Sequence, residues 1–143
     1  MEPRISYIVG RLDRVLRRRL AAALEPLGLT LPAYTALSVL RAQDGLSNAR
    51  LARRSLVTPQ SMSEVLAFLV ERGYARREAE PGHGRVLRIE LTSAGARVLE
   101  RCDRVVDDVE REMLGDLDAA DVARLRDALL HCGRALERDR TTG

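Results

Sequence analysis

Between residues 47 and 91 the spacing of hydrophobic residues changes from one typical of a helix to one typical of a strand. Along residues 59–71 apolar side chains recur at steps of three and four, which predicts a helix with one buried face. Along residues 85–91 apolar residues take every second position, which predicts a half-buried strand. The chain therefore has to form a unit in which helices lead directly into a β-ribbon.

Residues that favour helix ends divide this stretch. Ser47 is a good N-cap for a short helix over about residues 48–55. Thr58 and Pro59 open the next helix as its cap and first helical residue, and Gly73 ends it at the C′ position. The sequence predicts two short helices joined by a tight turn.

A hairpin is predicted after the second of these helices. Its strands cover residues 75–80 and 85–91, and the turn between them is Pro81-Gly82-His83-Gly84. Two such helices followed by a hairpin make a winged helix-turn-helix, a module that reads DNA. We therefore expect a mainly α fold with a small β-hairpin wing.

The second helix of such a module presents its N-terminal residues to base edges in the major groove. The polar residues predicted to be exposed there carry hydroxyl, amide and carboxylate groups that pair with bases. They are Thr58, Gln60, Ser61, Ser63 and Glu64. The alternative for these residues is an ordinary solvated helix surface.

Arginines lie on both sides of this helix in the sequence. Five are candidates for phosphate contacts that position the protein without reading bases: Arg50, Arg53, Arg54, Arg76 and Arg77. The wing candidates are His83, Arg85 and Arg88, of which Arg85 follows a glycine-rich tip that allows close approach to a narrow minor groove. A solvated surface charge is the alternative for any one of them.

Composition agrees with a soluble DNA-binding protein. Residues 1–91 contain 15 arginines and 9 acidic residues, a net charge of +6, whereas residues 92–143 have a net charge of −3. Counterion release on DNA favours this basic region. The chain has no apolar run of about 18 residues and begins Met-Glu-Pro-Arg rather than with a cleavable signal, so we expect no membrane contact and a cytoplasmic location.

Long amphipathic helices are predicted on both sides of the module. The first runs from about Ile5 to Leu24, Thr30 caps a shorter helix after it, and Thr92 caps another that extends to about Leu114. Asp118 caps the last helix, whose apolar residues step by three and four like a coiled-coil seam. That seam packs either against a second chain or against the chain's own preceding helix.

The two cysteines, Cys102 and Cys132, each fall on an apolar helix stripe. We expect reduced, buried thiols, with a redox-sensing thiol as the alternative. No Cys or His stands at a metal-ligand spacing, and no phosphate loop, dinucleotide fingerprint or nucleophile–base pair is recognisable. Neither a metal nor a cofactor is predicted, and an enzyme is not expected.

Three segments resemble the MarR family of bacterial transcription regulators: LTLPAYTALSVL, LARRSLVTPQSMSEVLAFLVERGYARR and GRVLRIELTSAGARVL. The resemblance implies one MarR-like domain over residues 1–143, with a winged helix-turn-helix lobe at about 30–91 and dimerisation helices at about 1–29 and 92–143. It also implies an obligate homodimer on a pseudo-palindromic operator in double-stranded DNA. Most such members are repressors released by a small-molecule effector, often phenolic, or by cysteine oxidation.

Two further sites are implied by the family's pattern. The first, fifth and sixth helices would supply the dimer interface, through Ile5, Ile8, Leu12, Val109, Met113, Val122, Leu125, Leu129 and Leu136. The ligand pocket would lie between the first, second and fifth helices, lined by Arg14, Leu16, Leu20, Tyr34 and Leu37.

The chain departs from the family's pattern at several places. Glu64 stands where a basic residue is usual, and the wing lacks the Asp that usually precedes its Arg85 by two residues. The operator sequence therefore cannot be carried over. The first helix carries no cysteine, unlike in the best-known redox members. Two hypotheses remain beside a ligand-responsive repressor: an oxidation-responsive regulator, and a winged-helix module that contacts only proteins.

Overall fold

The computed structural model describes residues 1–80 and 82–138, except for the side chains of Glu80 and of residues 83–86. In chain order the elements are α1 (Ile5–Leu24), the 3-10 helix η1 (Glu25–Leu27), α2 (Leu31–Ala42), α3 (Asn48–Arg54), α4 (Pro59–Glu71), β1 (Ala75–Glu80), β2 (His83–Leu91), α5 (Ser93–Leu114) and α6 (Ala119–Arg138). They divide into two compact units, Met1–Val109 and Glu110–Gly143.

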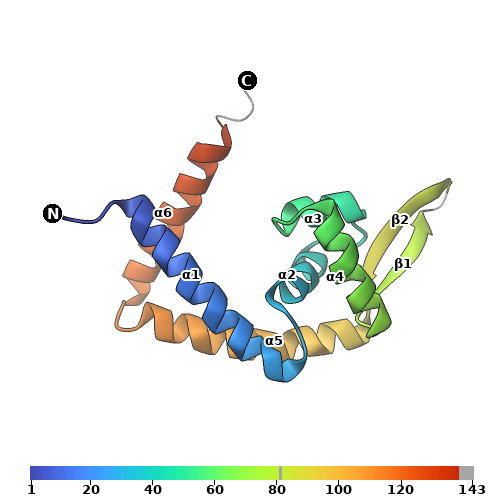
Figure 1. Cartoon of the computed structure of the whole chain (residues 1–143), viewed down its shortest axis with the longest axis horizontal. Helices are drawn as coiled ribbons and strands as arrows, with labels where there is room; N and C mark the ends of the chain where they lie inside the picture. Colours follow the sequence, from blue (N-terminus) through green and yellow to red (C-terminus); the bar gives the residue numbers. More distant parts are fainter. Residues whose placement is uncertain (81, 139–143) are drawn as a thin grey trace. The chain divides into compact units, whose positions relative to one another are not determined.

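The predicted fold class is confirmed. Helices α3 and α4 lie side by side and the antiparallel β1–β2 ribbon follows them, which is the helix-turn-helix with its wing (Figure 1). Among the described residues no single helix is long and apolar enough to span a membrane, and only the bent pair Ile5–Leu27 and Leu31–Ala42 passes by length and composition together.

The predicted helix caps are confirmed in atomic detail. The hydroxyl oxygens of Thr30, Ser47 and Thr58 accept hydrogen bonds from backbone amides at 3.3, 3.3 and 3.1 Å. A side-chain cap of this kind stabilises a helix by about 1 kcal/mol. Gly73 has a φ of 74°, the left-handed conformation expected at the end of α4.

The predicted start of the second strand was wrong. Strand β2 begins at His83 rather than Arg85, because Glu80 pairs with His83 after a shift in register beyond Ala79. Gly82 has a φ of 85°, which suits a tight connection. The ribbon therefore extends closer to its tip than the alternation of apolar residues indicated.

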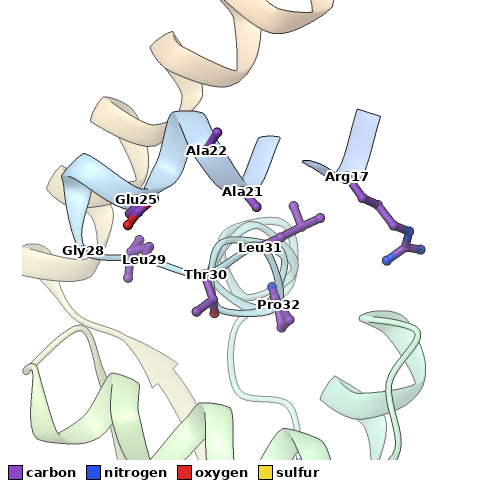
Figure 2. A pocket seen from close by; sticks show the side chains of 9 residues that line it. All are labelled: Arg17, Ala21, Ala22, Glu25, Gly28, Leu29, Thr30, Leu31 and Pro32. Carbon is purple, nitrogen blue, oxygen red and sulfur yellow. The ribbon is translucent and has the colours of Figure 1, made fainter. Parts of the chain in front are cut away.

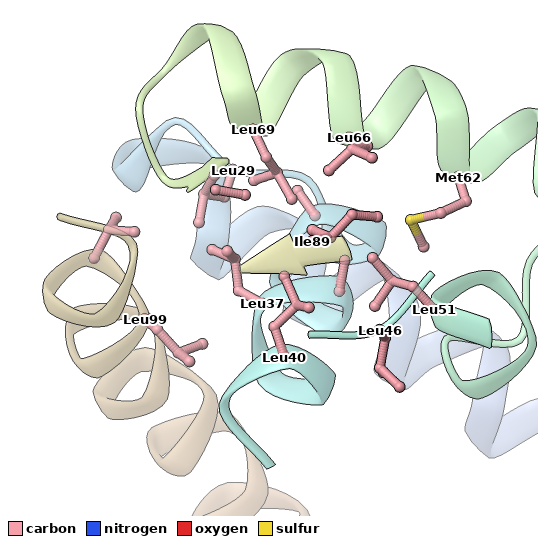
Figure 3. Close-up of a cluster of buried hydrophobic side chains, with 14 of the residues drawn as sticks. Leu29, Leu37, Leu40, Leu46, Leu51, Met62, Leu66, Leu69, Ile89 and Leu99 are labelled. Atoms are coloured by element: carbon pink, nitrogen blue, oxygen red, sulfur yellow. The ribbon is translucent and has the colours of Figure 1, made fainter. Parts of the chain in front are cut away.

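One hydrophobic core joins the helix-turn-helix to the base of the wing. Figure 3 shows side chains from α2, α4, β2 and α5 converging, with Leu37, Leu69, Ile89 and Leu99 among them. These side chains are fully buried or nearly so. Burying an aliphatic side chain of this size contributes about 1.5–3 kcal/mol, so the packing fixes α4 on its support.

The loop between α2 and α3 carries a short bridge that holds the wing. Leu46 pairs with Ile89, whose amide donates to the Leu46 carbonyl at 2.9 Å. The carbonyl of Ile89 accepts from the Gly45 amide at 3.0 Å, and the Leu91 amide donates to Asp44 at 3.0 Å. These bonds attach β2 to the helix-turn-helix at a point far from β2 in the sequence.

The start of α5 packs closely against the residues that connect α4 to the wing. Thr92 donates its hydroxyl to the Gly73 carbonyl at 2.6 Å and accepts the Gly95 amide at 3.0 Å. A Cβ at Gly95 would lie 2.1 Å from the Tyr74 carbonyl oxygen. The Leu-Thr-x-x-Gly segment therefore needs its threonine as a cap and its glycine for backbone contact.

A polar cluster ties α2 to α5. The Tyr34 hydroxyl donates to Asp103 at 2.9 Å, and Arg41 forms an ion pair with the same carboxylate. Burial and the bond to Asp103 raise the pKa of Tyr34 to about 12. Burial alone would raise the pKa of Asp103, but the bonds from Arg41 and Tyr34 outweigh it and lower that pKa. The carboxylate is therefore held ionised between two donors.

Asparagine at position 103 is expected to destabilise the fold by about 1–2 kcal/mol at neutral pH, since it removes a charge-assisted pair that solvent partly screens. The folded-state pKa of Asp103 is depressed below 3.8, so its stabilisation is complete above that value and is lost as the pH falls through the folded-state pKa. Urea unfolding at fixed protein concentration should show the difference between Asp103→Asn and wild type shrinking below about pH 3.8. An equal difference at neutral and strongly acidic pH would contradict this assignment.

The side chains predicted for a dimer interface are largely uncovered in the single chain. Ile5, Ile8, Leu12, Met113, Leu125, Leu129 and Leu136 are exposed, and Val109 and Val122 are half-buried. Helix α6 buries none of its residues. The expectation of a buried Cys132 was therefore wrong for the single chain, because its stripe has no covering partner there, whereas Cys102 is buried as expected.

Candidate nucleic-acid interface

The first turn of α4 presents polar groups on a fixed framework. Thr58 is held by its cap and by a bond between its hydroxyl and that of Ser61 at 3.0 Å. Gln60, Ser61 and Glu64 are exposed, while Met62 between them is fully buried and anchors the helix. The predicted base-reading residues therefore share one exposed face, except that the Ser63 hydroxyl is already bonded to the Pro59 carbonyl at 3.0 Å.

Asn48 braces this first turn from α3. Its side-chain amide donates to the Pro59 carbonyl at 3.3 Å and to the Ser63 hydroxyl at 3.4 Å. Sequence reasoning missed this residue, because Asn48 is eleven residues from Pro59 and only the packing of α3 on α4 brings them together. Asn48 therefore orients the helix that presents Gln60 and Glu64.

The predicted phosphate-contacting arginines fall into two groups. Arg50, Arg53 and Arg54 are exposed on α3. Arg77 lines a cavity of about 360 Å³ together with Asn48 and Ser63, between the start of α4 and the ribbon. Arg77 therefore lies beside the start of α4, and the other three arginines lie on the helix that packs against α4. A phosphate backbone would pass near this region if α4 entered the major groove.

Two other predicted cations already have partners. Arg76 donates to Glu90 at 2.8 and 3.1 Å and pairs with Glu78 at 3.1 Å. The hydrogen bond that Arg76 donates to Glu90 and the charges of both carboxylates raise the pKa of Arg76. Arg88 donates to the Gly45 carbonyl at 3.4 Å, across the bridge that attaches the wing. Both brace the ribbon, and the charge of Arg76 is offset before any DNA arrives.

Alanine at Arg77 is therefore expected to weaken duplex binding about 3- to 10-fold and to reduce the slope of log affinity against log salt by about one. Alanine at Arg76 removes the same formal charge from the same strand but should leave the slope unchanged, because this guanidinium is already paired. Anisotropy titrations at several salt concentrations measure both slopes. Equal slopes for the two variants would contradict the assignment of Arg77 to a phosphate contact and of Arg76 to bracing the ribbon.

The remaining wing candidates, His83 and Arg85, belong to strand β2. Their side chains lie outside the described residues. Leu87 belongs to the face of the strand that the alternation predicted to be buried, but its side chain is 47% exposed. Among the described side chains of the ribbon, those that pack in or against the core are Ala75, Ile89 and Leu91 at its base.

The residues predicted for a ligand pocket are dispersed. Leu16 and Leu20 line a cavity between α1, α2 and the turn after α3. Leu37 is fully buried in the core, and Tyr34 is engaged with Asp103, so neither has a free group for a ligand in this conformation. Arg14 is exposed on α1. The structure therefore does not gather the five predicted residues around one space.

The described residues hold no cluster suited to a metal ion, and the Cys102 thiol is not activated. In the part of the chain that the structure describes, no group of three or more His, Cys, Asp and Glu side chains could hold a metal ion. Burial raises the pKa of the Cys102 thiol, which disfavours the reactive thiolate.

A capped helix on a helix-turn-helix support, bordered by arginines and a two-stranded wing, defines the class of winged helix-turn-helix DNA-binding proteins. The chain belongs to the MarR family, whose model matches residues 27–86. It is 41% identical over 115 residues to the HTH-type transcriptional repressor Rv2887 of Mycobacterium tuberculosis, covering 80% of this chain and 83% of that protein. It is thus a DNA-binding transcription regulator.

Solved structures of that mycobacterial protein have the same fold. Its complex with DNA is 36% identical to this chain with a TM-score of 0.78, over 92% of this chain and 99% of the other. Its complex with salicylic acid is 37% identical with a TM-score of 0.75, over 92% and 97%.

Proposed function

We propose that this protein is a homodimeric repressor that binds a pseudo-palindromic operator and is released by a small molecule. The observation that carries the proposal is the exposed polar face of α4, capped by Thr58 and braced by Asn48. Support comes from the mycobacterial relative, which is named a repressor and has been solved with DNA and with salicylic acid. Such a regulator acts in the bacterial cytoplasm, and no catalytic role is proposed.

In this proposal the base contacts come from Gln60, Ser61 and Glu64. An amide pairs bidentately with adenine, a carboxylate accepts from the amino group of cytosine, and a hydroxyl serves several bases. Arg50, Arg53, Arg54 and Arg77 hold the phosphates on either side. These side chains pair with DNA only in the complex, so in the free protein they can remain exposed to solvent.

The homodimer is proposed from the exposed apolar residues of α1 and α6. Ile5 is 77% exposed and Leu136 is 76% exposed, which is unusual for side chains of their size on a regular helix stripe. A two-fold dimer would place two α4 helices on half-sites roughly 34–36 Å apart.

Fluorescence anisotropy tests the proposal directly. Duplexes tiling the gene's own upstream region are compared with shuffled duplexes at two salt concentrations, and light scattering gives the oligomeric state. Tight binding of a dimer to one native duplex is the expected result. Equal, strongly salt-weakened binding to every duplex would replace an operator reader with a general basic surface, and no binding at low salt would favour a module that contacts only proteins.

A further inference from the structure

The outward face of α4 carries a carboxylate opposite the residues that anchor this helix. Figure 3 shows Met62, Leu66 and Leu69 pointing from α4 into the core, and all three are buried. Glu64 stands midway between Met62 and Leu66 in the sequence, about 200° around the helix axis from each. Its exposed side chain therefore points away from the core, as does that of Gln60 one turn earlier.

No described side chain pairs with the Glu64 carboxylate. Residues three and four positions away are its neighbours on the surface of a helix, and none of them is basic. They are Gln60, Ser61, Ala67 and Phe68. The carboxylates of Glu90 and Asp103, by contrast, each form an ion pair with an arginine. Glu64 can therefore accept a hydrogen bond from a group outside the chain.

A negative charge on this face opposes binding to DNA unless it gains a specific partner. Three arginines of α3, which packs against α4, and Arg77 beside the start of α4 attract phosphates to this region. Entry of α4 into the major groove removes water from Glu64 and brings its charge near those phosphates. The resulting cost depends on the DNA sequence, because it is offset only where a base edge donates a hydrogen bond.

Cytosine is the base that such an acceptor selects. A carboxylate only accepts hydrogen bonds, and guanine presents two acceptors, N7 and O6, in the major groove. Thymine presents its O4 acceptor and a methyl group, and adenine has an N7 acceptor beside its amino donor. Cytosine presents the N4 amino group alone. It is therefore the base at which Glu64 gains a donor without meeting an acceptor on the same base.

We propose that Glu64 selects, at one position of each operator half-site, a cytosine whose N4 amino group is unmodified. In a base pair one N4 hydrogen bonds to guanine and the other points into the major groove, so a methyl group on N4 replaces the hydrogen that Glu64 accepts. Gln60 lies about 6 Å earlier along α4. Its adenine should therefore lie roughly two base pairs away, at ~3.4 Å per base pair. Selection by Glu64 rests on the proposed operator binding, to which it adds the chosen base and the modification that blocks the contact.

Competition anisotropy on the native duplex tests this selection. Each base pair of one half-site is exchanged in turn, and the affinities of wild type, Glu64→Ala and Gln60→Ala are measured. Replacing the selected cytosine should weaken binding of wild type on the order of 5- to 150-fold. Glu64→Ala should lose that preference at this position alone, whereas Gln60→Ala should relax a position roughly two base pairs away. Both residues are exposed and alanine favours a helix, so the variants should keep the fold.

A duplex with N4-methylcytosine at the selected position tests the atom that is contacted. The modified duplex should bind wild type on the order of 10-fold more weakly, because it loses a hydrogen bond to a charged group. It should bind Glu64→Ala as well as the unmodified duplex does, because that variant has no acceptor there.

Glu25→Ala is the charge-matched control. Glu25 is an exposed residue of η1, outside the helix-turn-helix, and Figure 2 shows it beside a cavity of about 710 Å³ between α1, η1 and the start of α2. This variant loses the same formal charge, so it should keep the wild-type preference at every position. Equal changes of preference in Glu25→Ala and Glu64→Ala would assign the effect to net charge and overturn the contact.

Three further results would overturn the selection by Glu64. They are the absence of any half-site position at which wild type prefers cytosine, an unchanged preference in Glu64→Ala, and equal weakening of both proteins by N4-methylcytosine. In each of these cases wild type still binds its native duplex, so the proposed function stands. A wild-type protein that binds no duplex would instead refute the proposed function, and selection by Glu64 with it.

Discussion

Alanine in place of Gly95 is expected to destabilise the folded chain by about 3 kcal/mol or more. Its Cβ would lie 2.1 Å from the Tyr74 carbonyl oxygen and 2.8 Å from a methyl carbon of Leu91. The backbone cannot move away freely, because the Tyr74 carbonyl also accepts the Thr92 amide at 3.2 Å. Domains are stable by only about 5–15 kcal/mol, so this loss should appear as a large fall in the urea midpoint.

Gly10 provides the matched control. It lies inside α1, an added Cβ would meet nothing within 4 Å, and it faces away from the apolar stripe of that helix. Gly10→Ala should therefore stabilise the protein by about 0.5–1 kcal/mol, since alanine loses less backbone entropy in a helix. A Gly95→Ala protein as stable as wild type would show that Gly95 does not pack tightly against the Tyr74 carbonyl.

Arginine in place of Leu129 is expected to convert the protein to a monomer and to lower operator affinity on the order of 100-fold. Leu129 is 52% exposed in the single chain, so arginine there costs the fold of one subunit little. In a dimer seam the same arginine would be buried without a partner. Light scattering measures the mass, and circular dichroism checks that the subunit stays folded.

Leu130 is the comparison residue for this experiment. It is also 52% exposed, but it lies off the stripe that runs through Leu125, Leu129 and Leu136. Leu130→Arg should remain a dimer and keep its affinity for DNA. A dimeric Leu129→Arg protein with full affinity would refute the proposed placement of the interface on α6.

Local sequence signals predicted the helices well. Thr30, Ser47 and Thr58 were assigned as caps from residue type alone, and each accepts the amide that a cap requires. The first helix was predicted over its observed range, Ile5–Leu24. Capping and helical periodicity act over a few residues, so they can be recognised in the sequence without knowledge of the tertiary fold.

The candidate site was only partly predictable. The polar face of α4 follows from helical spacing, but the brace from Asn48 and the pairing of Arg76 with Glu90 do not. Both depend on which elements lie beside each other. A charge count treats Arg76 and Arg77 alike, whereas the ribbon register places a carboxylate opposite only one of them: Arg76 pairs with Glu90 and Arg77 with Ile89.

The sequence by itself determined the order of helices and strands, the capped start of α4 and the family, because these depend on residue types at short spacing. The tertiary structure alone decided that Leu46 bridges Ile89, that Gly95 meets Tyr74, and that Ser55 carries an unpaired hydroxyl beside a cavity. Each of these features joins residues from separate elements. Contacts of that kind arise from packing, which no local pattern of hydrophobic and polar residues encodes.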